Sequence, residues 1–310
     1  MLCRCRYTSR RWDARGSFIS KSFRQIILMK SNLLKKHAKS FYWASFFLSS
    51  NTFDKCSTLY NFCRTLDDIV DGSNNLDIKK EVFSKFKKDF ENKNLSNQII
   101  KDMWSVIDSE DISYQIVIDL FDGVETDLGE EVVINSKKDL IVYSYRVAGT
   151  VGLMMSKILK VDNKEALKGA IDLGIAMQLT NIARDVCEDK ARNRQYIEHN
   201  FSSIKEIIKE SEIFYKNSFN SIGHIPIRSR FSVIVARRVY RKIGDYILKQ
   251  KNIDNYNKAG KIYIPMFEKV IQTFLSIFDF VKLLFIKNLN YDNQTNHNIL
   301  KQEINLNERI

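Results

Sequence analysis

Only two prolines, Pro226 and Pro265, interrupt this chain of 310 residues, and only 11 residues are glycine. Sheet-rich folds need many turns, and turns draw heavily on proline and glycine. The scarcity of both therefore favours long helices joined by short loops. Because 44% of the residues are hydrophobic, the chain can also bury a sizeable core. We predict an all-α fold, and no solenoid repeat or Gly/Ser/Pro linker divides it.

Apolar residues recur with helical periodicity from about residue 31 to residue 288, which we take as one domain. The polar, Asn-rich residues 289–310 form a tail that we expect to be frayed. We predict helices over 31–50, 53–71, 77–91, 98–108, 111–130, 138–160, 164–190, 203–220, 229–250 and 261–288.

Positive charge is concentrated at the N-terminus. Residues 1–30 hold eight Lys or Arg against one acid, so they contribute +7 of the net charge of +12. This Arg- and Ser-rich extension is typical of an organellar transit peptide, and a mis-assigned start with Met29 as the first residue is the other interpretation. The domain itself is mildly basic and lacks a basic stripe with interleaved aromatics, so we expect no nucleic-acid partner.

The cysteines and the hydropathy of the chain indicate in which cellular compartment the protein works. The five cysteines form no CxxC pair, which argues against a zinc site or disulfide framework and favours a reducing, cytoplasmic interior. An organelle is the alternative if residues 1–30 are a transit peptide. The apolar segment 270–286 is interrupted by Asp279 and Lys282, so we predict a core or surface-seeking helix rather than a membrane span.

Three aspartates lie close together in the otherwise apolar helix 53–71. Asp67 and Asp71 are four residues apart and share one helix face with Tyr60 and Arg64. Asp68 points about 100° away, and we expect it to support its neighbours. Two carboxylates at this spacing repel each other, so the helix either binds a cation or presents a solvated acidic face.

A second row of oxygen ligands favours the cation. Asn181, Asp185 and Asp189 also step by four, with Gln178 and Arg184 beside them. Two such rows suit Mg²⁺ that is shared with phosphate oxygens, because Mg²⁺ rarely sits in an all-protein cage. The arginines can then donate paired hydrogen bonds to the same phosphates.

The segment YSYRVAGTVGLMM (143–155) lies between the rows. Ala148, Gly149 and Gly152 remove side-chain bulk from an otherwise apolar helix. The space can admit a neighbouring helix or a long apolar ligand. On these residues alone, close helix packing is the simpler interpretation.

Together these motifs resemble the squalene/phytoene synthase family. YNFCRTLDDIVDG (60–72), YSYRVAGTVGLMM and QLTNIARDVCEDKARNRQYI (178–197) are similar to its three signature blocks, and HAKSFYWASFFL (37–48) to its N-terminal block. The resemblance covers roughly residues 31–285, and the wording is most like the phytoene synthase branch. It implies a single-domain isoprenoid synthase fold with a central hydrophobic cavity.

The resemblance also implies a reaction. Two geranylgeranyl diphosphates would be joined head to head, through prephytoene diphosphate, to phytoene, a step of carotenoid biosynthesis. A squalene or dehydrosqualene synthase acting on farnesyl diphosphate is the nearest alternative, and a non-catalytic assembly factor is another. The substrate and product are both apolar, so we expect peripheral contact with a membrane.

The implied roles fall on residues of all four blocks. Mg²⁺, for which Mn²⁺ can substitute, would be held by Asp67, Asp71, Asn181, Asp185 and Asp189. The implied diphosphate contacts are His37, Lys39, Ser40, Tyr60, Arg64, Gln178, Asn181 and Arg184. The implied catalytic set is Asp67, Asp71, Tyr143, Asp185, Asp189 and Tyr240. Aromatic residues within 41–47 would stabilise a carbocation.

The chain departs from the family pattern at several positions. Ala38 replaces a common Ser, Cys187 a usual Gly and Glu198 a usual Pro. EEVVINS (130–136) replaces the usual Arg-Tyr-x-Thr wording. We therefore assign no catalytic role to Asp122, Glu125 or Asp127, for which a solvated or structural acidic face is expected.

Overall fold

A computed structural model describes residues 39–72, 75–286 and 294–310. The helices are α2 (Lys39–Ser45), α3 (Ser50–Asp71), α4 (Leu76–Glu91), α5 (Gln98–Glu110), α6 (Tyr114–Glu125), α7 (Lys137–Ser144), α8 (Thr150–Ile158), α9 (Lys164–Lys190), α10 (Phe201–Ser221), α11 (Ile227–Leu248), α12 (Ile253–Ala259), α13 (Met266–Phe285) and α14 (Gln294–Lys301). The strands are β1 (Val132–Val133) and β2 (Arg194–Gln195), which pair in parallel.

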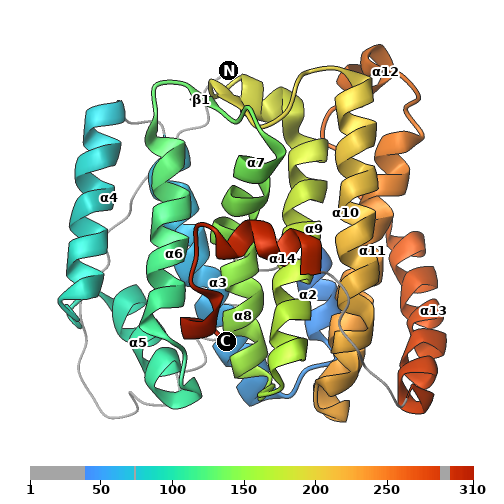
Figure 1. Cartoon of the computed structure of the whole chain (residues 1–310), viewed down its shortest axis with the longest axis horizontal. Helices are drawn as coiled ribbons and strands as arrows, with labels where there is room; N and C mark the ends of the chain where they lie inside the picture. Colours follow the sequence, from blue (N-terminus) through green and yellow to red (C-terminus); the bar gives the residue numbers. More distant parts are fainter. Residues whose placement is uncertain (1–38, 73–74, 287–293) are drawn as a thin grey trace, which may run out of the picture.

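The long helices stand side by side, from α4 at one edge to α13 at the other, and α14 crosses over them (Figure 1). Helix α9 occupies the centre and packs against α8, α10 and α11. Buried residues such as Leu167, Ile171 and Ile175 line its sides, as expected for a helix surrounded by others. The prediction of an all-α fold is confirmed.

The prediction of one continuous helix over 31–50 is wrong in its described part, because a turn separates α2 from α3. Helix α2 ends at Ser45, and Ser49 caps α3 by accepting a hydrogen bond from the Thr52 amide. Serine at this position stabilises a helix start rather than a helix interior. Residues 31–38 lie outside the described ranges.

Two further boundaries differ from the prediction. The predicted helix 138–160 is split into α7 and α8 by a π-helical turn, Tyr145–Gly149, a feature that often marks a functional site. The predicted helix 261–288 starts only after Pro265, and α12 was not predicted at all. Asn252 caps α12, and Gly260 follows it at a φ of 62°, so both of its end signals were present in the sequence.

The expectation of a frayed tail is wrong for residues 294–310. Helix α14 packs against α7, and Leu300, Ile304 and Leu306 are buried. Arg309 forms a two-point ion pair with Asp119 of α6, with both distances 3.0 Å. The polar composition concealed this docking because few apolar side chains and one arginine supply it.

The small residues of 148–152 serve close packing. A Cβ atom on Gly152 would lie 2.3 Å from the carbonyl oxygen of Ala170 in α9, and one on Gly174 would lie 2.2 Å from that of Ala148. The two helix backbones therefore touch without intervening side chains. Ala148 and Gly152 also line a cavity, so the two interpretations of this segment are compatible.

Gly152→Ala is expected to lower the free energy of unfolding by about 2 kcal/mol, because α8 must move away from α9. Gly244→Ala is the control, since its Cβ would meet only the side chain of Ile208, at 3.3 Å. Thermal unfolding of both variants checks this. A Gly152→Ala variant that melts at or above the wild-type temperature would contradict the packing described here.

Within the described ranges, no helix combines the length and the apolarity that a membrane span requires.

Candidate active site

The two predicted acid rows lie on helices α3 and α9 and meet at one end of the bundle. The chain after α9 connects them, because Arg192 and Arg194 both reach Asp71, at 3.1 and 2.9 Å. Both arginines also act on Asp189, where they offset part of the rise in pKa that burial and the Asp185 carboxylate cause. Acidic side chains from both rows therefore surround the same arginine pair.

We call the space between the two acid rows and this arginine pair the acidic recess. The negative charge of its carboxylates is only partly neutralised by the arginines. Desolvation, followed by the neighbouring Asp71, raises the pKa of Asp67 to about 7, although its side chain reaches solvent within the recess. Desolvation and the Asp185 carboxylate raise the pKa of Asp189 to about 7. Within the described residues, no three or more His, Cys, Asp or Glu side chains form a ready-made metal cluster.

The arginines of the two motifs do not have the same partners. Arg184 donates two hydrogen bonds to Asp185, at 2.8 and 2.6 Å, and Lys261 lies 3.4 Å from Asp185. Arg64 was expected on the face of Asp67 and Asp71 but forms its ion pair with Asp68. Asp68 thus supports a neighbour, as predicted, and that neighbour is the arginine.

From the sequence we expected Asp127 to belong to a solvated or structural acidic face, but in the structure it lies within the site. Its carboxylate accepts hydrogen bonds from Tyr143, at 2.9 Å, and Tyr196, at 2.6 Å. The two tyrosine rings stack at 4.9 Å. Desolvation raises the pKa of Asp127 and raises that of Tyr143 well above its usual value. The short pairing of β1 with β2 brings Arg194 to the Asp127 side of the recess.

Asp122 and Glu125 behave as expected for a structural acidic face. Both pair with Lys87 of α4, at 3.0 and 2.9 Å, on the outside of α6. Asp127 differs from them because it follows the end of α6 and turns inward.

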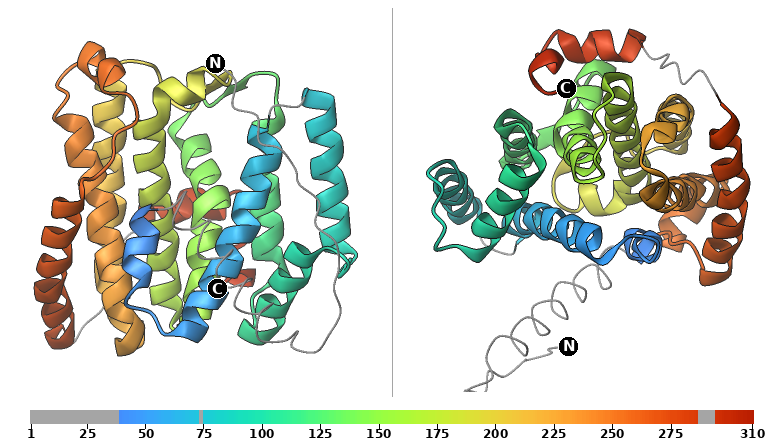
Figure 2. Two further views of the ribbon diagram at one scale, coloured as in Figure 1. Left: turned by 180° about the vertical axis from the view of Figure 1, so that it is seen from behind. Right: turned by 90° about the horizontal axis from the view of Figure 1, so that it is seen from below.

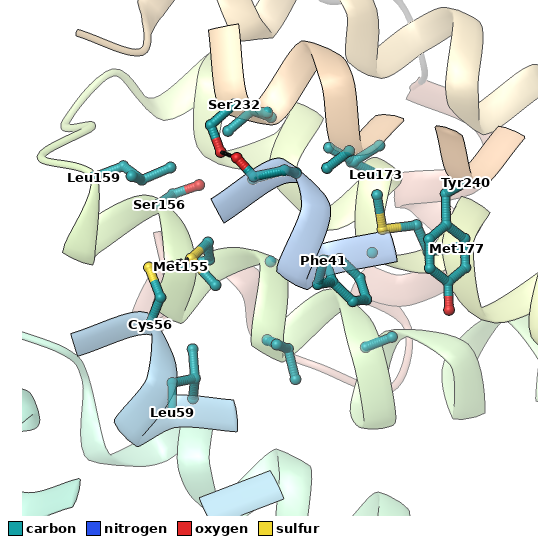
Figure 3. A pocket seen from close by; sticks show the side chains of 18 of the residues that line it. Phe41, Cys56, Leu59, Met155, Ser156, Leu159, Leu173, Met177, Ser232 and Tyr240 are labelled. Atoms are coloured by element: carbon teal, nitrogen blue, oxygen red, sulfur yellow. Dashed lines mark hydrogen bonds between the residues drawn. The ribbon is translucent and has the colours of Figure 1, made fainter. Parts of the chain in front are cut away.

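Beside the recess lies an apolar cavity of about 330 Å³, walled by α2, α3, α8, α9 and α11. Tyr240, Asn181, Gln178 and Tyr60 lie among its lining residues at the acidic end. Tyr240 donates to Asn181 at 2.8 Å, which joins the cavity to the second row. Figure 3 shows Tyr240 and Phe41 at one end of the cavity and Leu159 at the other. The predicted central hydrophobic cavity is confirmed.

Phe41 is the member of the aromatic group 41–47 that lines this cavity. Its ring packs against Tyr240 at 5.1 Å. Trp43 instead donates to Thr273 of α13, and Phe46 is 63% exposed, so among residues 41–47 it is Phe41 that is placed to meet a ligand in the cavity. His37 lies outside the described ranges, whereas Lys39 and Ser40 are the first residues of α2.

A family model described as squalene/phytoene synthase matches residues 34–200, more than half of the chain. The chain belongs to the squalene/phytoene synthase family. Members of this family are prenyltransferases that act on prenyl diphosphates, so the chain is an enzyme of that class. The resemblance predicted from the motifs is thereby confirmed.

Individual relatives agree. The 15-cis-phytoene synthase of Pantoea ananas is 28% identical over 240 residues, covering 67% of this chain and 77% of that protein. The chloroplastic phytoene synthase of Daucus carota is 28% identical over 268 residues, covering 76% and 66%. A solved dehydrosqualene synthase with bound ligand superposes with a TM-score of 0.70 at 25% identity, covering 84% of this chain and 98% of that one.

Arg192, Arg194, Tyr196 and Asp127 are the residues of this squalene/phytoene synthase site that sequence reasoning did not assign. They follow helix ends, where helical periodicity gives no information about direction. Arg192 and Asn193 lie in a turn in which Asn193 has a φ of 57°, and only Arg194 begins β2, so no regular spacing predicts where the two arginines point. No sequence signal distinguishes Asp127 from Asp122 and Glu125 either.

The raised pKa of Asp189 predicts how stability depends on pH. The pKa is 3.8 ordinarily and about 7 in the folded chain, so the folded state holds this proton more tightly. Stability therefore falls as pH rises from about 4 to 7, and the cost is complete above pH 7. Without added metal, Asp189→Asn is expected to gain about 1–2 kcal/mol at pH 8 after solvent screening, and nothing near pH 4. Thermal melts at both pH values check this, and a lower melting temperature at pH 8 would contradict it.

Proposed function

We propose that the chain is a phytoene synthase, which joins two geranylgeranyl diphosphates head to head through prephytoene diphosphate. The observation that carries this is that Asn181 of the second acid row, held by Tyr240 at 2.8 Å, also lines the apolar cavity, so the acidic recess borders the cavity directly. One substrate can then place its diphosphate among the charges while its hydrocarbon chain enters the cavity. The phytoene synthases among the relatives support this branch of the family.

We infer that Mg²⁺ is the cofactor, with Mn²⁺ as a substitute. The residues present fit Mg²⁺ because they supply hard carboxylate and amide oxygens from two helices. The raised pKa values of Asp67 and Asp189 show that the chain's own cations neutralise these carboxylates only in part. A site that needs substrate phosphates to complete it is typical of Mg²⁺, which agrees with the lack of a preformed cluster in the described ranges. Its holders would be Asp67, Asp71, Asn181, Asp185 and Asp189. Bound Mg²⁺ supplies charge neutralisation for a leaving diphosphate.

The chain's own cations can share that task. Arg192 and Arg194, now paired with Asp71, can turn to an incoming diphosphate, as can Arg184 and Lys261 from Asp185. Charge-assisted bonds from such arginines favour phosphate strongly. Each carboxylate that loses its arginine becomes available as a ligand, so substrate entry and ligand release are coupled.

The cavity and the tyrosines serve the later steps. Apolar walls keep water from an allylic cation, and the neighbouring aromatic rings of Phe41 and Tyr240 can stabilise it. Asp127 keeps Tyr143 as a neutral hydrogen-bond donor, and the raised pKa of Tyr143 keeps its hydroxyl protonated, so no phenolate is present to accept a proton. We therefore infer that the released diphosphate takes the final proton.

The second candidate is a dehydrosqualene or squalene synthase acting on farnesyl diphosphate, favoured by the fold match to the solved dehydrosqualene synthase. Incubating the purified protein and Mg²⁺ with each diphosphate, with and without NADPH, and identifying the hydrocarbon separates the two. We expect phytoene from geranylgeranyl diphosphate without NADPH. A hydrocarbon formed from farnesyl diphosphate but not from geranylgeranyl diphosphate would overturn the assignment to the phytoene synthase branch. No product from either diphosphate would favour a non-catalytic assembly factor.

The location remains a prediction. A cytoplasmic enzyme and an organellar one are distinguished by residues 1–30, which lie outside the described ranges. The chloroplastic phytoene synthase of Daucus carota gives the organellar alternative a precedent among relatives.

A further inference from the structure

Helix α13 packs with its polar side inward. Glu268, Gln272 and Ser276 are buried against the bundle, and Asp279 forms an ion pair with Arg238 of α11 at 2.6 Å. Soluble helices normally bury the apolar face and expose the polar one. This helix does the reverse.

The outward side of α13 carries ten large apolar side chains, each between 43% and 78% exposed. At 100° per residue they occupy an arc of about 140° that contains no charge. They expose roughly 1,000 Å², at about 200 Å² for a whole side chain, which exceeds the largest patch of a typical monomer. This α13 stripe consists of Met266, Phe267, Val270, Ile271, Phe274, Ile277, Phe278, Val281, Leu284 and Phe285.

The stripe continues onto α2, which lies beside α13 (Figure 2, right). Trp43 donates to Thr273 at 2.8 Å, and the exposed ring of Phe46 packs against Trp43 at 6.1 Å. Helix α2 also supplies Phe41 and Ala44 to the wall of the cavity. The same short helix therefore joins the outer apolar surface to the interior one.

The charges around the stripe are of one sign. Both acids of α13, Glu268 and Asp279, face inward with polar partners, so only Lys269 and Lys282 remain toward its borders. A wide apolar face with basic flanks is the composition of helices that lie in an anionic membrane surface.

We propose that the α13 stripe, extended by Phe46, docks on an anionic lipid surface. This goes beyond the reaction, since it assigns a binding site on the outside of the molecule. A second copy of the chain fits less well, because a two-fold contact pairs the same patch with itself. The stripe offers no acid to meet the lysines of the other copy.

Flotation with vesicles of phosphatidylcholine and phosphatidylglycerol, and of phosphatidylcholine alone, tests the proposal. Wild type is expected to float with the mixed vesicles and less with the neutral ones. The double variant Phe274→Ser/Phe278→Ser, at the middle of the stripe, is expected to bind the mixed vesicles with an affinity at least about tenfold lower than that of the wild type. The control is Ile78→Ser/Val82→Ser on α4, an apolar pair 44% and 42% exposed with the same four-residue spacing at the opposite edge of the bundle (Figure 1), which should bind as wild type.

Thermal unfolding of each variant shows that it is folded, and Val270→Ser/Val281→Ser provides a second stripe variant. Hydrocarbon synthesis in detergent is measured separately, so failure to bind vesicles and failure of the proposed function are distinguishable. Three results would overturn the proposal: no flotation of wild type with mixed vesicles, equal losses in the stripe and control variants, or a sedimenting dimer that the stripe variants alone dissociate.

Discussion

Asp71→Asn and Asp185→Asn are each expected to lower kcat/KM by about 1,000-fold or more, because each removes the charge of a proposed metal ligand in one of the two rows. In the structure Asp71 and Asp185 form ion pairs with arginines. The amide of an introduced Asn binds an arginine or a metal cation less strongly than the carboxylate does. Steady-state formation of hydrocarbon from geranylgeranyl diphosphate measures the loss. Both variants should also unfold at a lower temperature than the wild type, because the side chains of Arg194, 9% exposed, and Arg184, 14% exposed, lose a carboxylate partner; activity is therefore compared at a temperature at which each variant is folded.

Asp68→Asn is the matched control for the first row. Asp68 belongs to the same helix, but its side chain is 58% exposed and its partner is Arg64. Losing an exposed pair should cost less than about 1 kcal/mol of stability and leave kcat/KM within about threefold. If Asp71→Asn retained activity similar to that of Asp68→Asn, α3 would not supply the ligands assigned to it.

Arg309→Ala is expected to lower the free energy of unfolding by about 3 kcal/mol and the melting temperature by about 5–10 °C. The two partners are 9% and 8% exposed, and the substitution leaves the Asp119 carboxylate with Tyr145, at 3.0 Å. Tyr145 begins the π-helical turn that precedes α8. The loss should therefore loosen the wall of the cavity as well as the C-terminal segment.

Glu308→Ala controls for the position in the chain. Its side chain is 63% exposed and pairs with Arg309 from outside, so the melting temperature should change by less than about 2 °C. Differential scanning calorimetry compares the two variants. Equal, small shifts would mean that the docking of residues 294–310 contributes little to stability.

The fold was largely predictable because its signals are local. Helical periodicity and the scarcity of proline indicate the long helices, and four-residue spacing places the acid rows of α3 and α9 on single faces. The breaks were less visible. The Ser49 cap depends on one hydroxyl, and the π-helical turn at Tyr145–Gly149 reflects close packing against α6 and α9 rather than any residue that ends a helix.

The site was predictable only where it lies on helices. Arg192 and Arg194 approach Asp71 because the strand after α9 pairs with residues from a loop 60 positions earlier, and no local pattern encodes that contact. Arg64 shows a similar limit. Its place on the helix fits either Asp67 or Asp68, and the ion pair with Asp68 follows from side-chain direction rather than from spacing.

The central claim is that both acid rows bind one diphosphate through a shared divalent cation. A crystal structure of the protein with Mg²⁺ and an unreactive prenyl thiodiphosphate tests it most directly. We expect metal between Asp67 or Asp71 of α3 and Asp185 or Asp189 of α9, with Arg192 and Arg194 moved from Asp71 to the diphosphate and the prenyl chain in the cavity beside Phe41. A diphosphate bound away from the rows, with Asp71 still paired to both arginines, would contradict the claim.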